Sequence, residues 1–222
     1  MEAAMLIPSG FASGFGLTAA LIVAIGAQNL FVLRQGLLRR HVAPVVMFCA
    51  LSDMLLVSAG VLGMGAVVRT IPALVWVMSL GGAVFLAWYG LGALRRAMAP
   101  AAMVADERDR PDSLRGTLGR VAAFTYLNPH VYLDTVLLMG AVGGGLPGPA
   151  RPLFVAGAAT ASALWFTGLG FGAQLLRPVF ARPAAWRVLD GIVAVVMLAL
   201  AGMLAVRGLG GAAPYLAALY RF

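Results

Sequence analysis

The sequence has no lysine, only one cysteine and few charged residues of any kind. Charged residues make up 11% of the 222 positions, whereas apolar residues make up 62%. A soluble domain or a disordered chain would need more polar residues, so both classes are excluded. The single cysteine, Cys49, cannot close an internal disulfide, which also excludes a disulfide scaffold and a dithiol redox carrier. We interpret Cys49 as a buried packing residue.

All sixteen basic residues are arginine, and the net charge is +8. In a soluble protein this excess would suggest a nucleic-acid partner. Here the arginines lie between long apolar runs, so they are better explained as determinants of membrane orientation. We therefore expect no nucleic-acid partner. The residue pattern also indicates no cofactor and no metal site, and Ser52 beside Asp53 is too weak a hint of a nucleophile and base to indicate an enzyme.

The long apolar runs predict an all-α, polytopic membrane protein. Each run exceeds the roughly 18 residues that a helix needs to cross a bilayer. The lipid bilayer is therefore the main surrounding of the chain. The six predicted transmembrane helices cover residues 11–33, 42–68, 72–94, 121–143, 153–176 and 188–206.

A charged segment, residues 95–120, divides the chain into two three-helix halves, 1–94 and 121–207. Because each half has an odd number of spans, the halves must insert in opposite senses, as in inverted-repeat transporters. Twelve of the sixteen arginines follow the first, third and fifth spans. The positive-inside rule therefore places the 95–120 linker in the cytoplasm and both termini outside. Residues 208–222 are predicted to form a tail at the membrane interface.

The chain contains 28 glycines, several of them four residues apart. Such spacing allows two helices to approach closely, either within one subunit or across a homodimer interface. Both interpretations are open at this point. The pairs are Gly10/Gly14, Gly140/Gly144 and Gly168/Gly172.

Three aspartates lie inside the predicted spans. Asp53 and Asp134 are each roughly 20 Å into their helices at the usual rise, near the middle of the membrane. Ionisable groups at that depth are costly and typically functional, although the two could also form a structural hydrogen-bonded pair. Asp190 lies three residues after Arg187, so we expect a local salt bridge at the cytoplasmic interface.

Two spans are interrupted by polar residues. Gly26 precedes Gln28 and Asn29 in the first span, and Asn128 precedes Pro129 in the fourth. Pro129 cannot donate the helix hydrogen bond to the fourth residue before it, so that carbonyl group needs another partner or a cavity. Both interruptions lie in the cytoplasmic half of the membrane, which predicts helix breaks at Gly26 and Pro129.

Helical spacing assigns the polar residues of the fourth span to two faces. Tyr126, His130 and Asp134 are predicted to share one face. Asn128, Tyr132 and Thr135 are predicted to share the other. His130, one turn before Asp134, could be its proton partner, or it could be packed with a single hydrogen bond.

Three segments resemble the LysE/ArgO family of basic-amino-acid exporters: GAQNLFVLRQGLLRR, LSDMLLVSAG and FTYLNPHVYLDTVLLMGAVGG. The resemblance extends from about residue 10 to 207 and is closer to the arginine-exporting branch. It implies an exporter of L-arginine or L-lysine in the bacterial inner membrane, driven by the proton motive force. Two positions depart from the family pattern, because Ala27 stands where proline is usual and Asp190 where asparagine is common.

The residues suit this implied substrate. A guanidinium or ammonium group needs a carboxylate in a low-dielectric site, and Asp53 and Asp134 are available. The α-carboxylate can be met by backbone N–H groups at a broken helix, with help from Gln28, Asn29 and Asn128.

Moving a positive charge outward against the membrane potential costs about 2.3 kcal/mol per 100 mV, which exchange for an incoming proton would offset. We assign proton coupling to Asp134 with His130, and Asp53 is the alternative. A channel or transporter for another small cation or a metal ion is the competing hypothesis.

Overall fold

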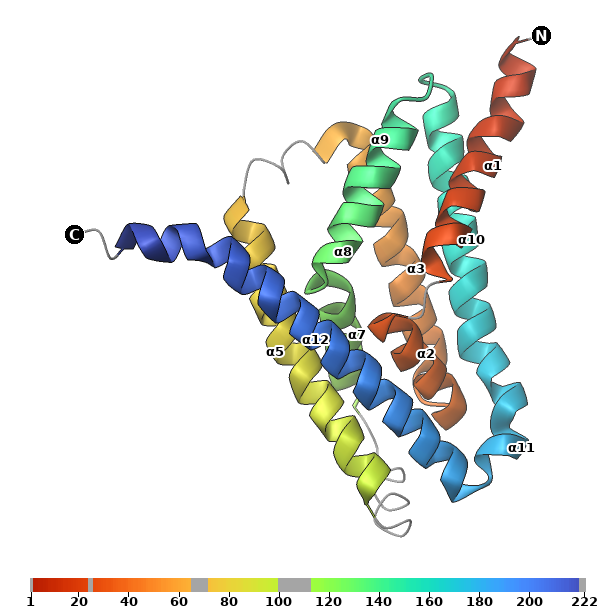
Figure 1. Cartoon of the computed structure of the whole chain (residues 1–222). Coiled ribbons are helices and arrows are strands. Elements are labelled where there is room, and N and C mark those ends of the chain that lie inside the picture. The colour runs from red at the N-terminus through yellow and green to blue at the C-terminus, as the bar shows by residue number, and fades with distance from the viewer. Residues whose placement is uncertain (1, 24–25, 65–71, 100–112, 220–222) are drawn as a thin grey trace.

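The computed structural model describes residues 2–23, 26–64, 72–99 and 113–219, and within these ranges all regular secondary structure is helical. The all-α prediction is therefore confirmed for the described residues (Figure 1). The central part of the predicted 95–120 linker lies outside them. The elements are α1 (Glu2–Ile22), α2 (Ala27–Leu38), α3 (Val42–Ala59), η1 (Gly60–Met64), α5 (Pro72–Met98), α7 (Leu114–Tyr126), α8 (Pro129–Val131), η2 (Tyr132–Leu138), α9 (Met139–Gly144), α10 (Ala150–Gly172), η3 (Ala173–Leu176), α11 (Arg177–Phe180) and α12 (Pro183–Leu219).

Four helical segments of the described chain are long and apolar enough to cross a membrane. A fifth is obtained if the bent pair Gly10–Ile22 and Ala27–Leu38 is counted as one span. The fourth predicted span, 121–143, is divided among α7, α8, η2 and α9, so no single helix of it reaches the required length. Six spans therefore stay a prediction. The four unbroken segments are Val42–Gly63, Trp76–Met98, Ala150–Phe180 and Pro183–Gly210.

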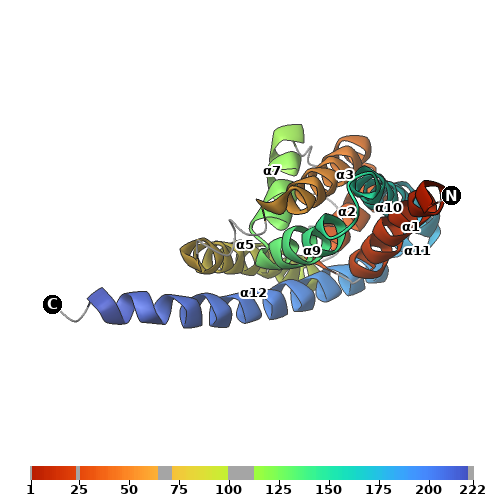
Figure 2. The same cartoon turned by 90° about the horizontal axis from the view of Figure 1, so that it is seen from above.

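The helices pack in pairs (Figures 1 and 2). α12 lies along α5, α1 lies along α10, and α3 packs against α10. The end of α2, the start of α3 and the junction of α11 with α12 lie together at one end of the bundle, the lower end in Figure 1. This end is called the α2 end below. α12 continues unbroken to Leu219, so the predicted tail at 208–222 begins as part of this helix.

Glycines let α1 and α10 approach closely. A Cβ at Gly14 would overlap the backbone of Phe154, and one at Gly157 would overlap the backbone of Phe11. Gly10 lies on the same face of α1 and faces α10 as well. The first glycine pair is thus used within the subunit, and a homodimer stays a prediction.

The buried core is larger on the side of the α2 end. One cluster of buried apolar residues joins α2, α3, α5, α7 and α12, and Cys49 belongs to it with no exposed surface. A smaller cluster, with Phe154 at its centre, lies toward the other end. Large apolar side chains such as Leu62, Trp88 and Val195 remain exposed on the long helices, where lipid would cover them.

Candidate functional site

The first helix break separates α1 from α2. The two helices meet at 83°, and Gly26, which precedes α2, has an extended backbone. The side chain of Asn29 ties the break together, because its Nδ2 donates a hydrogen bond of 2.8 Å to the carbonyl oxygen of Ile22. Among the described residues, no side chain caps the start of α2. The positive end of the α2 dipole therefore lies at the first break.

The second break separates α7 from α8. α7 ends at Tyr126, and Asn128 is extended because a residue before proline disfavours the helical conformation. The Oδ1 of Asn128 then accepts a hydrogen bond of 3.1 Å from the backbone N–H of His130, which caps the new helix that starts at Pro129. The hydroxyl of Tyr132 donates to the carbonyl oxygen of Tyr126 at 3.1 Å. A carbonyl group left without a helical partner is thereby satisfied.

A polar cavity of about 190 Å³ lies between the two breaks. Its wall includes residues from α1, α2, α3, α10 and the segment that follows the second break. All five residues predicted to bind substrate line it, together with Gly26 and His130. Pro129 is not part of the wall, although both of its neighbours in the chain are. The five are Gln28, Asn29, Asp53, Asn128 and Asp134.

The two carboxylates reach this cavity from different helices. Asp53 extends from α3, and its Oδ2 accepts a hydrogen bond of 2.6 Å from the hydroxyl of Ser162 on α10. Asp134 lies in η2, a π-helix that directly follows the second break. Such segments are frequent at functional sites because they redirect side chains. Asp53 and Asp134 therefore present two acidic groups to the same space.

Amide groups line the cavity as well. The Nε2 of Gln28 is buried and has no hydrogen-bond partner within the described ranges. A buried donor without a partner is costly, so it favours a ligand that offers an oxygen. The neighbouring Asn29 is fixed on its other side by Trp165, whose Nε1 donates to Oδ1 at 3.3 Å.

The prediction of two separate polar faces in the fourth span is wrong. Asn128 and Thr135, assigned to one face, line the same cavity as His130 and Asp134, assigned to the other. The reason is that the chain is not one regular helix, because it breaks before Pro129 and then changes to π-helical spacing.

Tyr126, which was assigned to the face of His130 and Asp134, precedes the break. Its hydroxyl donates a hydrogen bond of 2.9 Å to Ser52. Ser52, which had been the only hint of a nucleophile, is thus occupied in a contact between α3 and α7.

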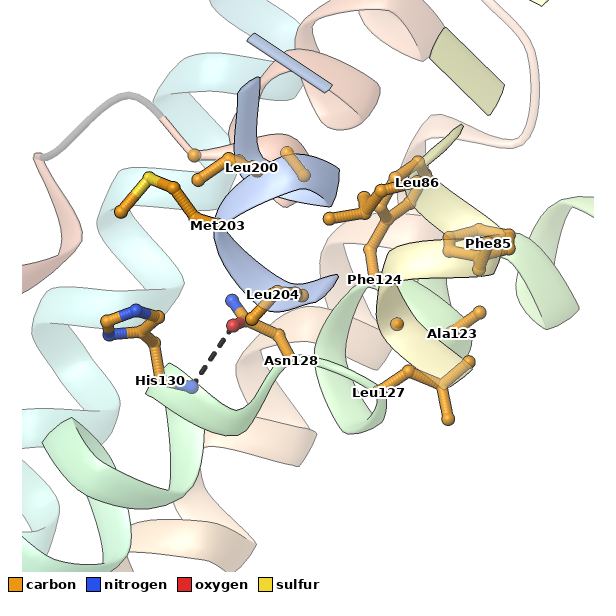
Figure 3. Close-up of a pocket in the computed structure, with 13 residues that line it drawn as sticks. Phe85, Leu86, Ala123, Phe124, Leu127, Asn128, His130, Leu200, Met203 and Leu204 are labelled. Carbon is orange, nitrogen blue, oxygen red and sulfur yellow. Dashed lines mark hydrogen bonds between the residues drawn. The ribbon is translucent and has the colours of Figure 1, made fainter. Parts of the chain in front are cut away.

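His130 lies at the boundary of a second, mostly apolar cavity of about 300 Å³ (Figure 3). Gly26, Ala27, Asn128 and His130 line both cavities, so the two breaks form the wall between them. The Nε2 of His130 is 2.8 Å from the guanidinium of Arg207. Arginine can only donate, so Nε2 of His130 is the acceptor in this contact.

Asp190 is not where the sequence placed it. We expected a local salt bridge with Arg187 at the interface, but Asp190 is fully buried and forms ion pairs with Arg34 of α2 and Arg96 of α5. Arg187 itself is exposed. The prediction is wrong because α12 turns Asp190 toward α2 and α5, and spacing along one helix contains no information about a partner on another.

Other residues of the site carried little signal in the sequence. Ser162 is a small polar residue in a long apolar run, and nothing in the chain relates it to Asp53, which is 109 positions away. Thr18 and Thr135 line the cavity as well. Trp165 lies in the same apolar run as Ser162, and its position in the sequence does not relate it to Asn29. The buried Arg34 was counted among the arginines that set orientation, not among residues of the membrane interior.

A bundle of apolar helices around a cavity at two helix breaks defines a multi-pass membrane protein. A family model for LysE type translocators matches residues 19–208. The chain therefore belongs to the LysE-type translocator family.

Relatives of known description cover most of both chains. An arginine exporter protein, ArgO, of Salmonella enteritidis is 40% identical over 200 residues, which are 90% of this chain and 95% of the relative. ArgO of Serratia proteamaculans is 39% identical over 198 residues, 89% and 97% of the two chains. A Mycobacterium tuberculosis protein, named as a candidate amino-acid transporter, is 47% identical over 179 residues, 81% and 88%. No solved structure matches this chain.

Proposed function

We propose that this protein exports basic amino acids, L-arginine and/or L-lysine, across the bacterial inner membrane in exchange for protons. The observation that carries the proposal is the composition of the polar cavity. Two carboxylates, the start of α2 and three amide side chains line one space between the broken helices. The similarity to arginine exporters over 90% of the chain supports the same substrate class.

Asp53 and Asp134 are suited to the cationic side chain of such a substrate. A carboxylate that accepts hydrogen bonds from a guanidinium or ammonium group makes a strong, charge-assisted contact. Ser162 occupies only Oδ2 of Asp53 in the described contacts, so Oδ1 is available to the substrate. A neutral side chain would leave both acids uncompensated, which favours basic over neutral amino acids.

The same cavity is suited to an α-carboxylate. The start of α2 contributes the positive end of its helix dipole, and the buried Nε2 of Gln28 has no hydrogen-bond partner among the described residues. Helix starts and amide donors together favour an anion. Asn128 and Asn29 line the same space, although Asn29 already bonds Ile22 and Trp165.

Export of a cation against an inside-negative potential needs an energy source. An incoming proton cancels the charge moved outward, which otherwise costs about 2.3 kcal/mol per 100 mV. Asp134 is our choice for the proton carrier, with His130 one turn earlier on the same cavity wall. In the present structure His130 contacts Arg207, so proton exchange with Asp134 requires that contact to open.

The arrangement of breaks supports an inverted repeat of two three-helix halves. α1 and α2 begin the first half, and α7, α8, η2 and α9 begin the second, so each half starts with an interrupted span. Paired interruptions of this kind are typical of inverted-repeat transporters with a central binding site. On this model the arginine-rich linker at 95–120 is cytoplasmic.

Counterflow in proteoliposomes tests the proposal. Liposomes loaded with unlabelled arginine are given external labelled arginine, and a pH gradient is then imposed. We expect exchange of arginine or lysine and net transport that depends on the gradient. Exchange of neutral amino acids alone would refute the substrate class. Transport of a divalent metal without amino-acid exchange would favour the alternative of a cation channel.

A further inference from the structure

A second charged cluster lies away from the polar cavity, near the α2 end. Asp190 of α12 is fully buried, and its Oδ1 pairs with both Arg34 of α2 and Arg96 of α5. The Arg96 contact is 3.2 Å long, and the Arg34 side chain is only 10% exposed. None of these three residues lines either of the two cavities described above.

The cluster joins three elements that would otherwise be free to separate. α2 is a half-helix of 12 residues, attached to α1 only through the first break. Arg34 of α2 forms an ion pair with Asp190 of α12, and Arg96 in the last turn of α5 pairs with the same carboxylate. The two contacts connect α2 to α12 and α5. Removing one partner of a buried ion pair leaves an uncompensated charge and strongly destabilises the protein. Separating α2 from α5 and α12 therefore has a high free-energy cost.

The position of the cluster makes it a closure between the cavity and the α2 end. Gln28 lines the cavity at the start of α2, and Arg34 follows further along the same helix. Between the two, Phe31 and Val32 are each only 1% exposed, within the larger buried core. In this conformation the route from the cavity to the α2 end is therefore packed shut.

We propose that the Arg34–Asp190–Arg96 cluster is a lock that closes the binding cavity on the side of the α2 end. Release of the lock allows α2 to move away from α5 and α12, which opens the cavity to that side. The lock also positions the start of α2, which carries the amide donors of the site. Two guanidinium groups face one carboxylate, so the closed route also repels small cations.

The only cysteine of the chain is a built-in reporter of this opening. Cys49 on α3 is fully buried and lies one helical turn before Asp53. It is seven residues from the start of α3 at the α2 end, roughly 10 Å along the helix. A thiol reagent that enters from the α2 end should therefore reach Cys49 only when the lock is open.

The experiment measures the rate at which a membrane-impermeant, sulfonate-bearing methanethiosulfonate modifies Cys49 in vesicles of each orientation. In Asp190→Asn, labelling from the α2 end should rise at least tenfold, with no rise from the opposite side. The triple variant Arg34→Asp, Arg96→Asp and Asp190→Arg restores opposite charges at both contacts and should return to slow labelling. The measurement needs no substrate, so its failure is distinct from a failure of the proposed export function.

Arg96→Gln provides a milder test that keeps the Arg34 pair, and it decides the matter if Asp190→Asn does not fold. Its labelling rate should rise by a smaller factor, whereas the matched control Arg95→Gln, at an exposed neighbour, should behave as the wild type. Unchanged labelling in folded Asp190→Asn or Arg96→Gln would overturn the lock. Equal acceleration from both sides would also overturn it, because that result indicates general loosening.

Discussion

The contact between Gly60 and Gly140 sets the spacing of the two helices that carry the acidic residues. Gly60 follows α3, seven residues after Asp53, and Gly140 follows η2, six residues after Asp134. A Cβ added at Gly140 would lie 2.7 Å from the carbonyl carbon and oxygen of Gly60. Ordinary van der Waals contact begins at 3.4 Å. Gly140→Ala therefore requires the two backbones to separate by about 0.7 Å.

The expected cost can be estimated from this overlap. Forcing an extra methyl group into a packed interior typically costs about 1–3 kcal/mol. Alanine recovers up to about 1 kcal/mol because it is a better helix former than glycine. We expect a net loss of about 1–2 kcal/mol of stability. The effect on transport should be larger, because a displacement near 1 Å at a binding site can lower a rate on the order of a hundredfold.

The matched control is Gly144→Ala, one turn further along α9. A Cβ there would be 3.4 Å from the carbonyl oxygen of Val61, which is ordinary contact. Thermal unfolding in detergent and arginine counterflow in proteoliposomes measure the two effects separately. Wild-type stability and exchange in Gly140→Ala would refute the reasoning. So would an equal loss in Gly144→Ala, because the defect would then not depend on the Gly60 contact.

Four further predictions concern the site and the topology. Asp53→Asn should lower substrate affinity at least tenfold and weaken counterflow, because it loses a charge-assisted contact of about 1.5–3 kcal/mol. Asp134→Asn should retain exchange but lose export driven by a pH gradient; full activity in both variants would contradict these roles, and the reverse pattern would exchange them. Pro129→Ala should insert normally and transport poorly, and wild-type export would mean that the proline serves packing only. Reporter fusions within 95–120 should read as cytoplasmic and fusions after residue 207 as external, and a cytoplasmic C-terminus would remove the inverted-repeat model.

Much of the candidate site followed from rare polar residues in apolar runs. Gln28, Asn29, Asp53, Asn128 and Asp134 were selected because polar groups in a bilayer need a reason to be there, and the structure gathers all five around one cavity. What these residues bind stays a proposal. The assignment of the polar residues of the fourth span to two helix faces was wrong. It assumed a regular helix, whereas this span contains a break and a π-helical segment.

Partners on distant elements could not be predicted. Ser162 bonds Asp53, and Arg34 bonds Asp190, across 109 and 156 positions of the chain. A single sequence gives no distance between such residues, because the contact depends on how whole helices pack. Asp190 illustrates the consequence, since the nearest arginine in the sequence is exposed and the actual partners come from α2 and α5.

Local features of the chain account for its lipid surroundings, its helical class and the positions of its helix breaks. Apolar runs long enough to cross a bilayer favour membrane-spanning helices. Pro129 disfavours the helical conformation at Asn128, the residue before it. The packing of the helices sets which groups meet. Two breaks far apart in the chain face one cavity, and three charged residues from α2, α5 and α12 meet near the α2 end. Hydropathy and helix breaking depend on residues that are neighbours in the sequence. The meeting of distant side chains depends on how closely helices pack, for example at the contact between Gly60 and Gly140.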